Sequence, residues 1–203
     1  MVRRRSKAKK LLLARHCETG PDYFGRFVGS SDIGLGPMAP EQAERLAGVI
    51  EGYNPEAVYC SPLKRARKTL EMVNDHYELP GAWEDDRLRE IDFGRWEGLS
   101  FAEIAMRDTE LVNRWAVWSP DFAFPEGEAV SDFLVRTQNM ADRMAALDEE
   151  TILVIAHGGV VRAMLCHYLR LPPEHYLLFD VKPARLVAVD VFREGGVLSG
   201  FNL

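Results

Sequence analysis

The sequence predicts an α/β protein of three layers, with a mostly parallel central sheet between two layers of helices. Short apolar runs alternate along the chain with segments whose apolar residues recur every three or four positions, the pattern of alternating strands and helices. The chain has 203 residues, 47% of them hydrophobic, which suits one domain with a sizeable core. We expect a single domain over residues 10–203, preceded by a flexible basic arm over residues 1–9.

The first half of the chain contains two strand-helix pairs. Residues 10–14 are an apolar run typical of a buried strand, and residues 41–53 follow with apolar side chains on one helical face. Residues 57–60 form the second apolar run. The Ser61-Pro62 pair after it is typical of a helix N-cap followed by the first helical position, so we expect the next helix to begin there.

The second half repeats the alternation and closes the sheet. Residues 133–147 have helical spacing interrupted by a threonine, and residues 151–156 form a strongly apolar strand before another predicted helix. Residues 186–192 and 197–203 read as closing strands around a turn at Gly195-Gly196. Strands alternating with helices favour a sheet covered on both faces. The longest apolar run has five residues, which is too short to span a membrane.

Residues 83–125 have no clear period and contain all four tryptophans of the chain. We interpret this stretch as a lid-like insertion that lies over the sheet and the site. Its aromatic side chains either fill a core or line a substrate pocket, and the sequence leaves both roles open.

Arginine and histidine side chains follow three of the predicted strands. Arg15 and His16 follow the first, Arg65 lies in the first helical turn after the second, and His157-Gly158 follows a third. Ligands of open α/β sheets bind beyond the carboxyl ends of the strands. There, arginines could clamp phosphate oxygens and a histidine could attack phosphorus. We expect such a site to need no metal and no other cofactor.

Four motifs in chain order resemble the histidine phosphatase superfamily, whose fold is phosphoglycerate mutase-like. They are Ala14-Arg15-His16-Cys17-Glu18-Thr19, Ser61-Pro62-Leu63-Lys64-Arg65-Ala66, Arg89-Glu90-Ile91-Asp92-Phe93-Gly94-Arg95-Trp96-Glu97-Gly98 and Ala156-His157-Gly158-Gly159. Each motif is weak alone, but four at compatible spacing over about residues 10–170 are specific.

The resemblance implies a role for each matching residue. His16 would be the nucleophile, and Arg15, Arg65 and His157 would hold the phosphoryl oxygens. Glu90 would protonate the leaving oxygen and then activate water. A carboxyl with this role needs a raised pKa, which we expect burial beneath the aromatic insertion to supply. Further residues fall where relatives contact phosphate or substrate: Thr19, Asp22, Arg26, Gly29 and Gly158.

Of the residues that depart from the family pattern, which also include Gly36, Ala39 and Ala129, two bear on the proposed site. Cys17 stands where relatives usually have glycine, so its side chain would crowd the phosphate loop or offer a thiol to oxidation. Asp22 stands where asparagine is usual, and its charge opposes an anionic substrate unless it pairs with Arg26. These departures make it unsafe to carry a substrate over from relatives.

The leading functional hypothesis is a metal-independent phosphomonoester phosphatase that forms a phosphohistidine. Its substrate would be a small phosphorylated metabolite, with α-ribazole 5′-phosphate as one candidate, because the motifs resemble the phosphatase branch of the family. A cofactor-dependent phosphoglycerate mutase is the enzymatic alternative. Gly159, where mutases commonly have asparagine, weighs against the mutase, and Arg26 weighs slightly for it. A non-catalytic phosphate-binding or interaction protein is a third alternative, suggested by Cys17 and Asp22.

The charge distribution and the cysteine content limit the kinds of partner and the cellular compartment that we expect for this protein. The net charge is −6, but the first ten residues hold six Lys or Arg and no acid, so the remainder carries 19 basic and 31 acidic residues, a net −12. An acidic body of this kind disfavours nucleic acid as a partner. We expect a small phosphorylated metabolite as the partner and no membrane association, and we leave a homodimer open. Three cysteines without a CxxC pair fit a reducing, cytoplasmic compartment.

Overall fold

The structure, a computed structural model, describes residues 8–203 and has a six-stranded sheet of order β3-β2-β4-β1-β5-β6. The strands are β1 (Lys9–Arg15), β2 (Ala57–Cys60), β3 (Ala82–Glu84), β4 (Thr151–Ala156), β5 (Leu186–Phe192) and β6 (Gly195–Gly200). Strands β1 to β4 pair in parallel, whereas β5 and β6 are antiparallel to their neighbours. The predicted mostly parallel sheet is confirmed.

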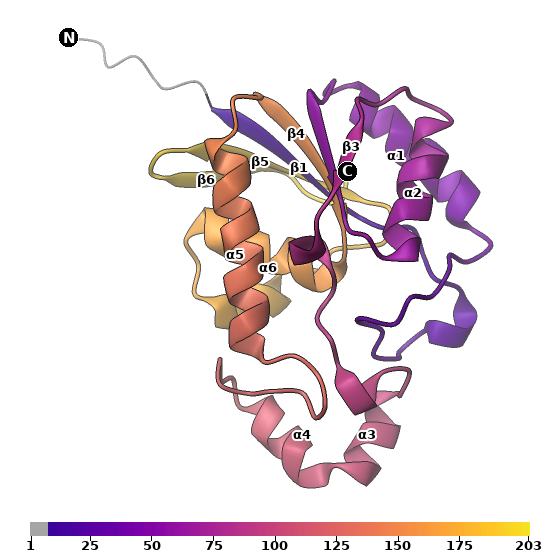
Figure 1. The fold of residues 1–203 in the computed structure, drawn as a ribbon, viewed down its shortest axis with the longest axis vertical. Helices are drawn as coiled ribbons and strands as arrows, with labels where there is room; N and C mark the ends of the chain where they lie inside the picture. Colours follow the sequence, from indigo (N-terminus) through magenta and orange to yellow (C-terminus); the bar gives the residue numbers. More distant parts are fainter. Residues whose placement is uncertain (1–7) are drawn as a thin grey trace.

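Helices cover both faces of this sheet, as Figure 1 shows. Helices α1 (Ala39–Glu51) and α2 (Lys64–Asn74) lie on one face, and α5 (Val130–Ala146) and α6 (Gly158–Leu169) lie on the other. The shorter elements are α3 (Phe101–Arg107), α4 (Thr109–Ala116) and the 3-10 turns η1 (Pro21–Tyr23), η2 (Asp86–Leu88), η3 (Gly94–Trp96) and η4 (Pro173–Leu178). Within residues 8–203, no helix is long and apolar enough to cross a membrane.

Alternating side chains of the central strands explain why their sequences are apolar throughout. In β1, Leu11 and Leu13 belong to the core beneath α5 and α6, whereas Leu12 and Ala14 belong to the core beneath α1 and α2. All four are fully buried. Because successive side chains of a strand point to opposite faces, a strand covered on both sides needs apolar residues at every position.

Three predicted boundaries are wrong. Helix α2 begins at Lys64 rather than after Ser61, because its first backbone N–H is capped by Asp32 Oδ1 at 2.6 Å from a distant loop. The turn between the last two strands lies at residues 193–194, and Gly195 already belongs to β6. Most of the predicted basic arm lies outside the described residues, but Lys9 already begins β1.

The aromatic insertion begins later than predicted, because residues 82–84 form β3 and pair with β2. Trp83 is therefore a residue of the sheet edge and stacks on Tyr59. The rest of the stretch, with α3 and α4, extends beyond the carboxyl ends of the parallel strands (Figure 1). Its aromatic residues include the fully buried Trp96. Trp96 packs against Phe122 and Phe124, so the insertion continues the core of the sheet.

Replacing Trp96 by alanine should destabilise the protein strongly. We expect Trp96→Ala to lower the free energy of unfolding by about 3–5 kcal/mol, the usual cost of removing a buried aromatic side chain. The indole Nε1 also donates to Asp108 Oδ2 at 2.7 Å. The matched control is Trp83→Ala, because Trp83 is 53% exposed. Urea unfolding measures both variants, and equal losses would contradict the assignment of Trp96 to the core.

Candidate active site

The register of the two central strands places two histidines side by side. Arg15 at the end of β1 pairs with Ala156 at the end of β4, so His16 and His157 are the next residues on adjacent parallel strands. The backbone N–H of His16 donates to the Ala156 carbonyl at 2.9 Å. The two imidazole rings lie with centroids 5.1 Å apart in an edge-to-face arrangement. The sheet itself therefore sets their separation.

The surroundings of His16 leave one ring nitrogen available as a nucleophile. Nδ1 lies 2.6 Å from the Cys17 carbonyl, which can only accept, so Nδ1 carries the proton. Nε2 accepts a hydrogen bond from Arg65 Nε at 3.2 Å and therefore holds a lone pair. Burial, followed by the charges of Arg65 and Arg15, holds the pKa of His16 well below its ordinary value of 6.5. The imidazole is thus neutral near pH 7, the form that attacks phosphorus.

Two largely buried guanidinium groups flank His16 and have no carboxylate partner. Arg65, 1% exposed, donates to the carbonyls of Ser31 and Gly29, each at 2.7 Å. Arg15 donates through Nη1 to the Val181 carbonyl at 2.9 Å, while its buried Nε has no hydrogen-bond partner among the described residues. Across residues 8–203, neither arginine forms an ion pair. Such a site favours an anion, because backbone carbonyls orient a buried cation without neutralising it.

His157 offers a further unused polar atom. It is fully buried, and its Nε2 lies 2.7 Å from Ser61 Oγ, whereas its Nδ1 has no hydrogen-bond partner in the part of the chain that the structure describes. Burial, then the charge of Arg65, holds the pKa of His157 well below 6.5. Ser61, expected to cap α2, thus contacts this histidine instead. Because an unpaired buried polar atom is costly, a bound ligand that supplies a partner would stabilise the site.

Glu90 reaches the same region from the segment between β3 and the insertion. Its side chain is 9% exposed, and its carboxylate accepts the N–H groups of Ile91 at 3.1 Å and Gly159 at 2.8 Å. Gly159 lies in the first turn of α6, where backbone N–H groups have no helical partner. Burial lowers the pKa values of Arg15 and Arg65, and the negative charge of Glu90 acts in the opposite direction by raising them. The structure therefore brings Glu90 into electrostatic contact with both arginines.

Gly159 is a residue of this site that the sequence analysis used only against the mutase. A Cβ at position 159 would lie 2.4 Å from Glu90 Oε1, so any side chain there would displace the carboxylate. At the predicted Gly158, by contrast, a Cβ would meet the Arg15 guanidinium at an ordinary 3.6 Å. The second glycine of the His157-Gly158-Gly159 motif was the feature of the sequence that could have indicated this close approach to Glu90.

Gly29 shapes the loop behind Arg65. A Cβ at position 29 would lie 1.9 Å from the Ile91 carbonyl, so only glycine fits there. The loop is held by Glu97, whose carboxylate accepts the N–H groups of residues 29, 30 and 31. This contact presents the Gly29 and Ser31 carbonyls to Arg65. The sequence analysis quoted Glu97 within a motif but assigned it no role, because its five hydrogen bonds to residues 29–31 are tertiary contacts.

For three predicted substrate contacts, the structure shows no hydrogen bond to the histidines, arginines or Glu90 of the cluster within residues 8–203. Thr19 is half-buried, and Asp22 is exposed in η1. Arg26 donates at the surface to the Gly98 carbonyl at 2.8 Å and to Glu103 at 3.0 Å, and no ion pair between Asp22 and Arg26 is present within residues 8–203. These three residues remain predictions as substrate contacts.

Cys17 is accommodated in the core rather than in the phosphate loop. Its side chain is fully buried among the residues beneath α1 and α2, and burial raises the pKa of its thiol. Its backbone N–H donates to Thr69 Oγ1 at 2.9 Å. A buried, protonated thiol does not support the expected oxidation switch. The departure from glycine therefore leaves the phosphate site open.

A cavity of about 640 Å³ adjoins Glu90 and Gly159. Many of its lining side chains are aromatic. The insertion supplies Phe93, Trp115, Trp118, Phe122 and Phe124, and the rest of the chain supplies Phe27, Phe133 and Tyr176. Arg162 and Glu174 add charged groups. The aromatic insertion thus has both of the roles that the sequence left open, because it fills core and lines a cavity beside the site.

The fold and this cluster together define a class, the α/β proteins that handle phosphate groups at the carboxyl ends of parallel strands. The family model of the histidine phosphatase superfamily (branch 1) matches residues 11–203, and the chain belongs to this superfamily. The predicted family is confirmed.

Relatives of known name differ in their substrates. A crystal structure of a putative α-ribazole-5′-P phosphatase from Escherichia coli superimposes with a TM-score of 0.87, at 27% identity over 97% of each chain. Phosphoserine phosphatase 1 of Hydrogenobacter thermophilus is 26% identical over 96% of this chain and 92% of its own. A bifunctional protein of Mycobacterium tuberculosis is 35% identical over 79% of this chain. The matched region is only 44% of that longer relative.

The two buried histidines should make folding stability depend on pH. Both have folded-state pKa values well below 6.5, so below pH 6.5 the unfolded chain binds more protons and stability falls. We expect a slope of up to about 1.4 kcal/mol per pH unit for each histidine. Urea midpoints between pH 7.5 and 5.5 measure it. His157→Gln should reduce the slope, whereas the exposed His76→Gln should not. A flat profile would contradict the neutral assignment.

Proposed function

We propose that the protein is a metal-independent phosphomonoester phosphatase that forms a phosphohistidine at His16. One observation carries this proposal: a neutral imidazole, whose Nε2 lone pair accepts a hydrogen bond from Arg65, lies beside two largely buried arginines that form no ion pair within residues 8–203. A phosphate dianion would supply the missing charge, and the unpaired Arg15 Nε and His157 Nδ1 would gain a hydrogen-bonding partner.

In the first step, His16 Nε2 attacks phosphorus while Arg15, Arg65 and His157 bind the phosphoryl oxygens. The bond between phosphorus and the ester oxygen breaks, and its electron pair stays on that oxygen. The Glu90 carboxyl donates a proton to the same oxygen, so the product leaves as a neutral alcohol. The guanidinium groups stabilise the negative charge on the equatorial oxygens, which is the larger part of catalysis in phosphoryl transfer.

In the second step, water attacks the phosphohistidine. The Glu90 carboxylate takes a proton from this water, the phosphorus–nitrogen bond breaks, and its electron pair returns to His16 Nε2. Inorganic phosphate is released with Glu90 protonated again. The hydrogen bond from His16 Nδ1 to the Cys17 carbonyl keeps the ring in the same orientation through both steps.

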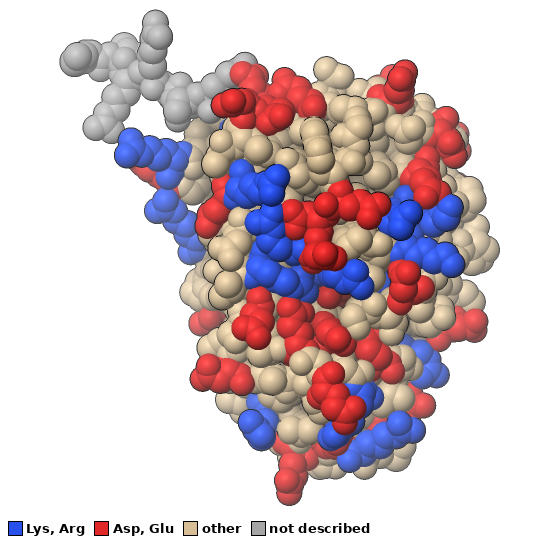
Figure 2. All heavy atoms as spheres, in the orientation of Figure 1, with Lys and Arg blue, Asp and Glu red and all other residues tan. Residues whose placement is uncertain are grey.

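The cavity beside Glu90 is the proposed place for the leaving alcohol. Its aromatic lining favours a small phosphorylated metabolite with an apolar, ring-bearing group, and a compound like α-ribazole 5′-phosphate is our first candidate. Figure 2 shows Lys and Arg side chains interspersed with Asp and Glu side chains on one face of the molecule. Ion pairs such as Arg67–Glu84 and Arg89–Asp86 give the same mixture of charges, which supports a metabolite rather than nucleic acid as the partner. The three buried free cysteines support a cytoplasmic setting.

Trapping of the intermediate tests the proposal. We expect the protein, in the presence of a chelator, to release phosphate from a phosphomonoester panel and to form an acid-labile phosphoprotein. His16→Ala should abolish both signals, whereas the exposed His76→Ala should change neither. A wild type without phosphate release or label would make the protein a non-catalytic phosphate binder. Transfer between positions of phosphoglycerate that exceeds hydrolysis would select the mutase.

A side chain at position 159 should impair turnover by displacing Glu90. We expect Gly159→Ala to lower kcat/KM for an alkyl phosphate about 100-fold, within the range for loss of a general acid. Gly48→Ala is the control, because a Cβ there meets no atom within 4 Å. Steady-state kinetics with thermal melts measures both variants. Full activity in Gly159→Ala would show that the contact with Glu90 is not needed.

A further inference from the structure

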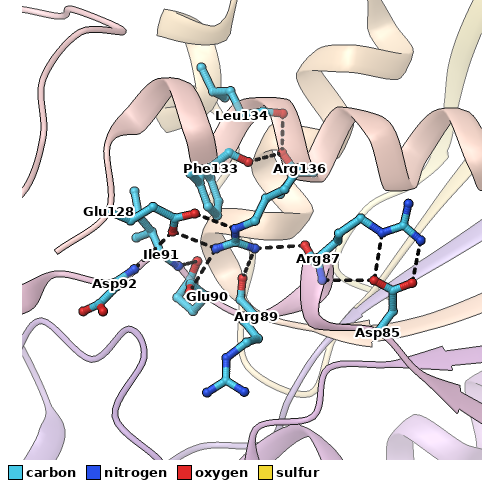
Figure 3. Close-up of polar contacts among 11 residues, drawn as sticks. Asp85, Arg87, Arg89, Glu90, Ile91, Asp92, Glu128, Phe133, Leu134 and Arg136 are labelled. Atoms are coloured by element: carbon cyan, nitrogen blue, oxygen red, sulfur yellow. Dashed lines mark hydrogen bonds and ion pairs between the residues drawn. The ribbon is translucent and has the colours of Figure 1, made fainter.

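We propose that Arg136 is the positioning residue for Glu90, an inference that rests on the proposed function. Arg136 lies on α5, it touches neither His16 nor the cavity, and no role in the reaction has been assigned to it above. Figure 3 shows its guanidinium surrounded by backbone carbonyls of the segment that bears Glu90.

The segment around Glu90 lacks the backbone hydrogen bonds of a helix or strand. Residues 89–93 belong to no helix or strand, so their carbonyl groups lack the partners that regular structure would provide. Arg136 supplies these partners. Its Nη1 donates to the carbonyls of Arg87 at 2.9 Å and Arg89 at 2.6 Å, and its Nη2 donates to the Glu90 carbonyl at 3.2 Å.

Glu128 completes the clamp. It accepts from Arg136 Nε at 2.6 Å and from Nη2 at 2.8 Å, which engages all five N–H groups of the guanidinium (Figure 3). The Glu128 carboxylate also accepts the N–H of Asp92 at 3.3 Å, and the Glu128 N–H donates to the Asp92 carbonyl at 2.9 Å. The pair therefore holds the chain on both sides of Glu90.

The clamp and α6 together define where the Glu90 carboxylate lies. Arg136 fixes the backbone of residues 87–90 from α5, and the Gly159 N–H fixes the carboxylate from α6. The guanidinium also packs over the Phe133 ring at 4.9 Å, and the side chain is 20% exposed, so it has little freedom to move. A shift of about 1 Å in a catalytic group can cost about 100-fold in rate.

A positioning role for Glu90 differs from a merely structural role in its dependence on the leaving group. Benzyl phosphate releases an alkoxide, which needs the proton from Glu90, whereas p-nitrophenyl phosphate releases a phenolate that leaves without one. Both rings suit the aromatic cavity. Because kcat/KM reports only the steps up to phosphoenzyme formation, the ratio of kcat/KM for the two substrates isolates proton donation. That ratio is also independent of the folded fraction of a preparation.

The test compares four variants with the wild type. We expect Glu90→Gln to lower kcat/KM for benzyl phosphate by about 10²- to 10⁴-fold, with a much smaller loss for p-nitrophenyl phosphate. Arg136→Gln should show the same selective loss at about 10- to 100-fold. Arg136→Lys should not restore the ratio, because an ammonium group cannot reach three carbonyls and a carboxylate at once. Glu128→Gln should lie between Arg136→Gln and wild type, and it serves if Arg136→Gln does not fold.

Arg143→Gln is the matched control. Arg143 lies on the same helix and approaches Asp85 at 4.0 Å, but no hydrogen bond to the carbonyls around Glu90 is recorded for it within residues 8–203. Its variant should keep the wild-type ratio. Equal losses for both substrates in Arg136→Gln, or no loss, while Glu90→Gln remains selective, would overturn the positioning role alone. A wild type inactive on both substrates, or a Glu90→Gln variant without selectivity, would overturn the proposed function itself.

Discussion

Two largely buried guanidinium groups that form no ion pair within residues 8–203 are the constraint on which the site depends. A buried cation is tolerated only when its N–H groups are satisfied, and here backbone carbonyls, which carry no charge, accept hydrogen bonds from Arg65. Burial, together with the positive charges of these two arginines, lowers the pKa of His16 and keeps its imidazole neutral, the form that the proposed reaction needs. Phosphate, as a dianion, is the ligand that balances this arrangement. The acidic total charge of the chain is therefore no obstacle to phosphate binding, because the local field decides.

Side-chain charges also hold the irregular segments that surround the site. Glu97 accepts the N–H groups of the loop behind Arg65, and Arg136 donates to the carbonyls of the segment that bears Glu90. The two contacts are complementary, since a carboxylate satisfies unpaired donors and a guanidinium satisfies unpaired acceptors. Loops held in this way can present catalytic groups with the accuracy of a helix or strand. Glu97 and Arg136 therefore hold in place the irregular segments from which much of the site is built.

The aromatic insertion connects stability with specificity. Trp96 is fully buried and continues the core of the sheet, whereas Trp115 and Trp118 line the cavity next to Glu90. One cluster of rings therefore packs against the domain with one side and lines the cavity beside Glu90 with the other. If this cavity holds the leaving alcohol, as proposed, substitutions that reshape it can alter the accepted alcohol without touching His16 or the arginines. Relatives named for α-ribazole phosphate and for phosphoserine are consistent with such variation.

The sequence by itself determined which strands are buried on both faces. It also determined that polar side chains follow the ends of these strands, namely Arg15, His16, Arg65 and His157. Those features are local, because hydrophobic periodicity and residues directly after a strand are visible in the chain. Only the tertiary structure decided that Ser61 contacts His157 instead of capping α2, that Cys17 points into the core, and that Arg26 binds Glu103 at the surface.

The same holds for Gly159 and Arg136, whose contacts with the Glu90 segment span 69 and 46 residues of sequence. Contacts across such separations depend on how loops and helices pack, and no local period or spacing encodes them.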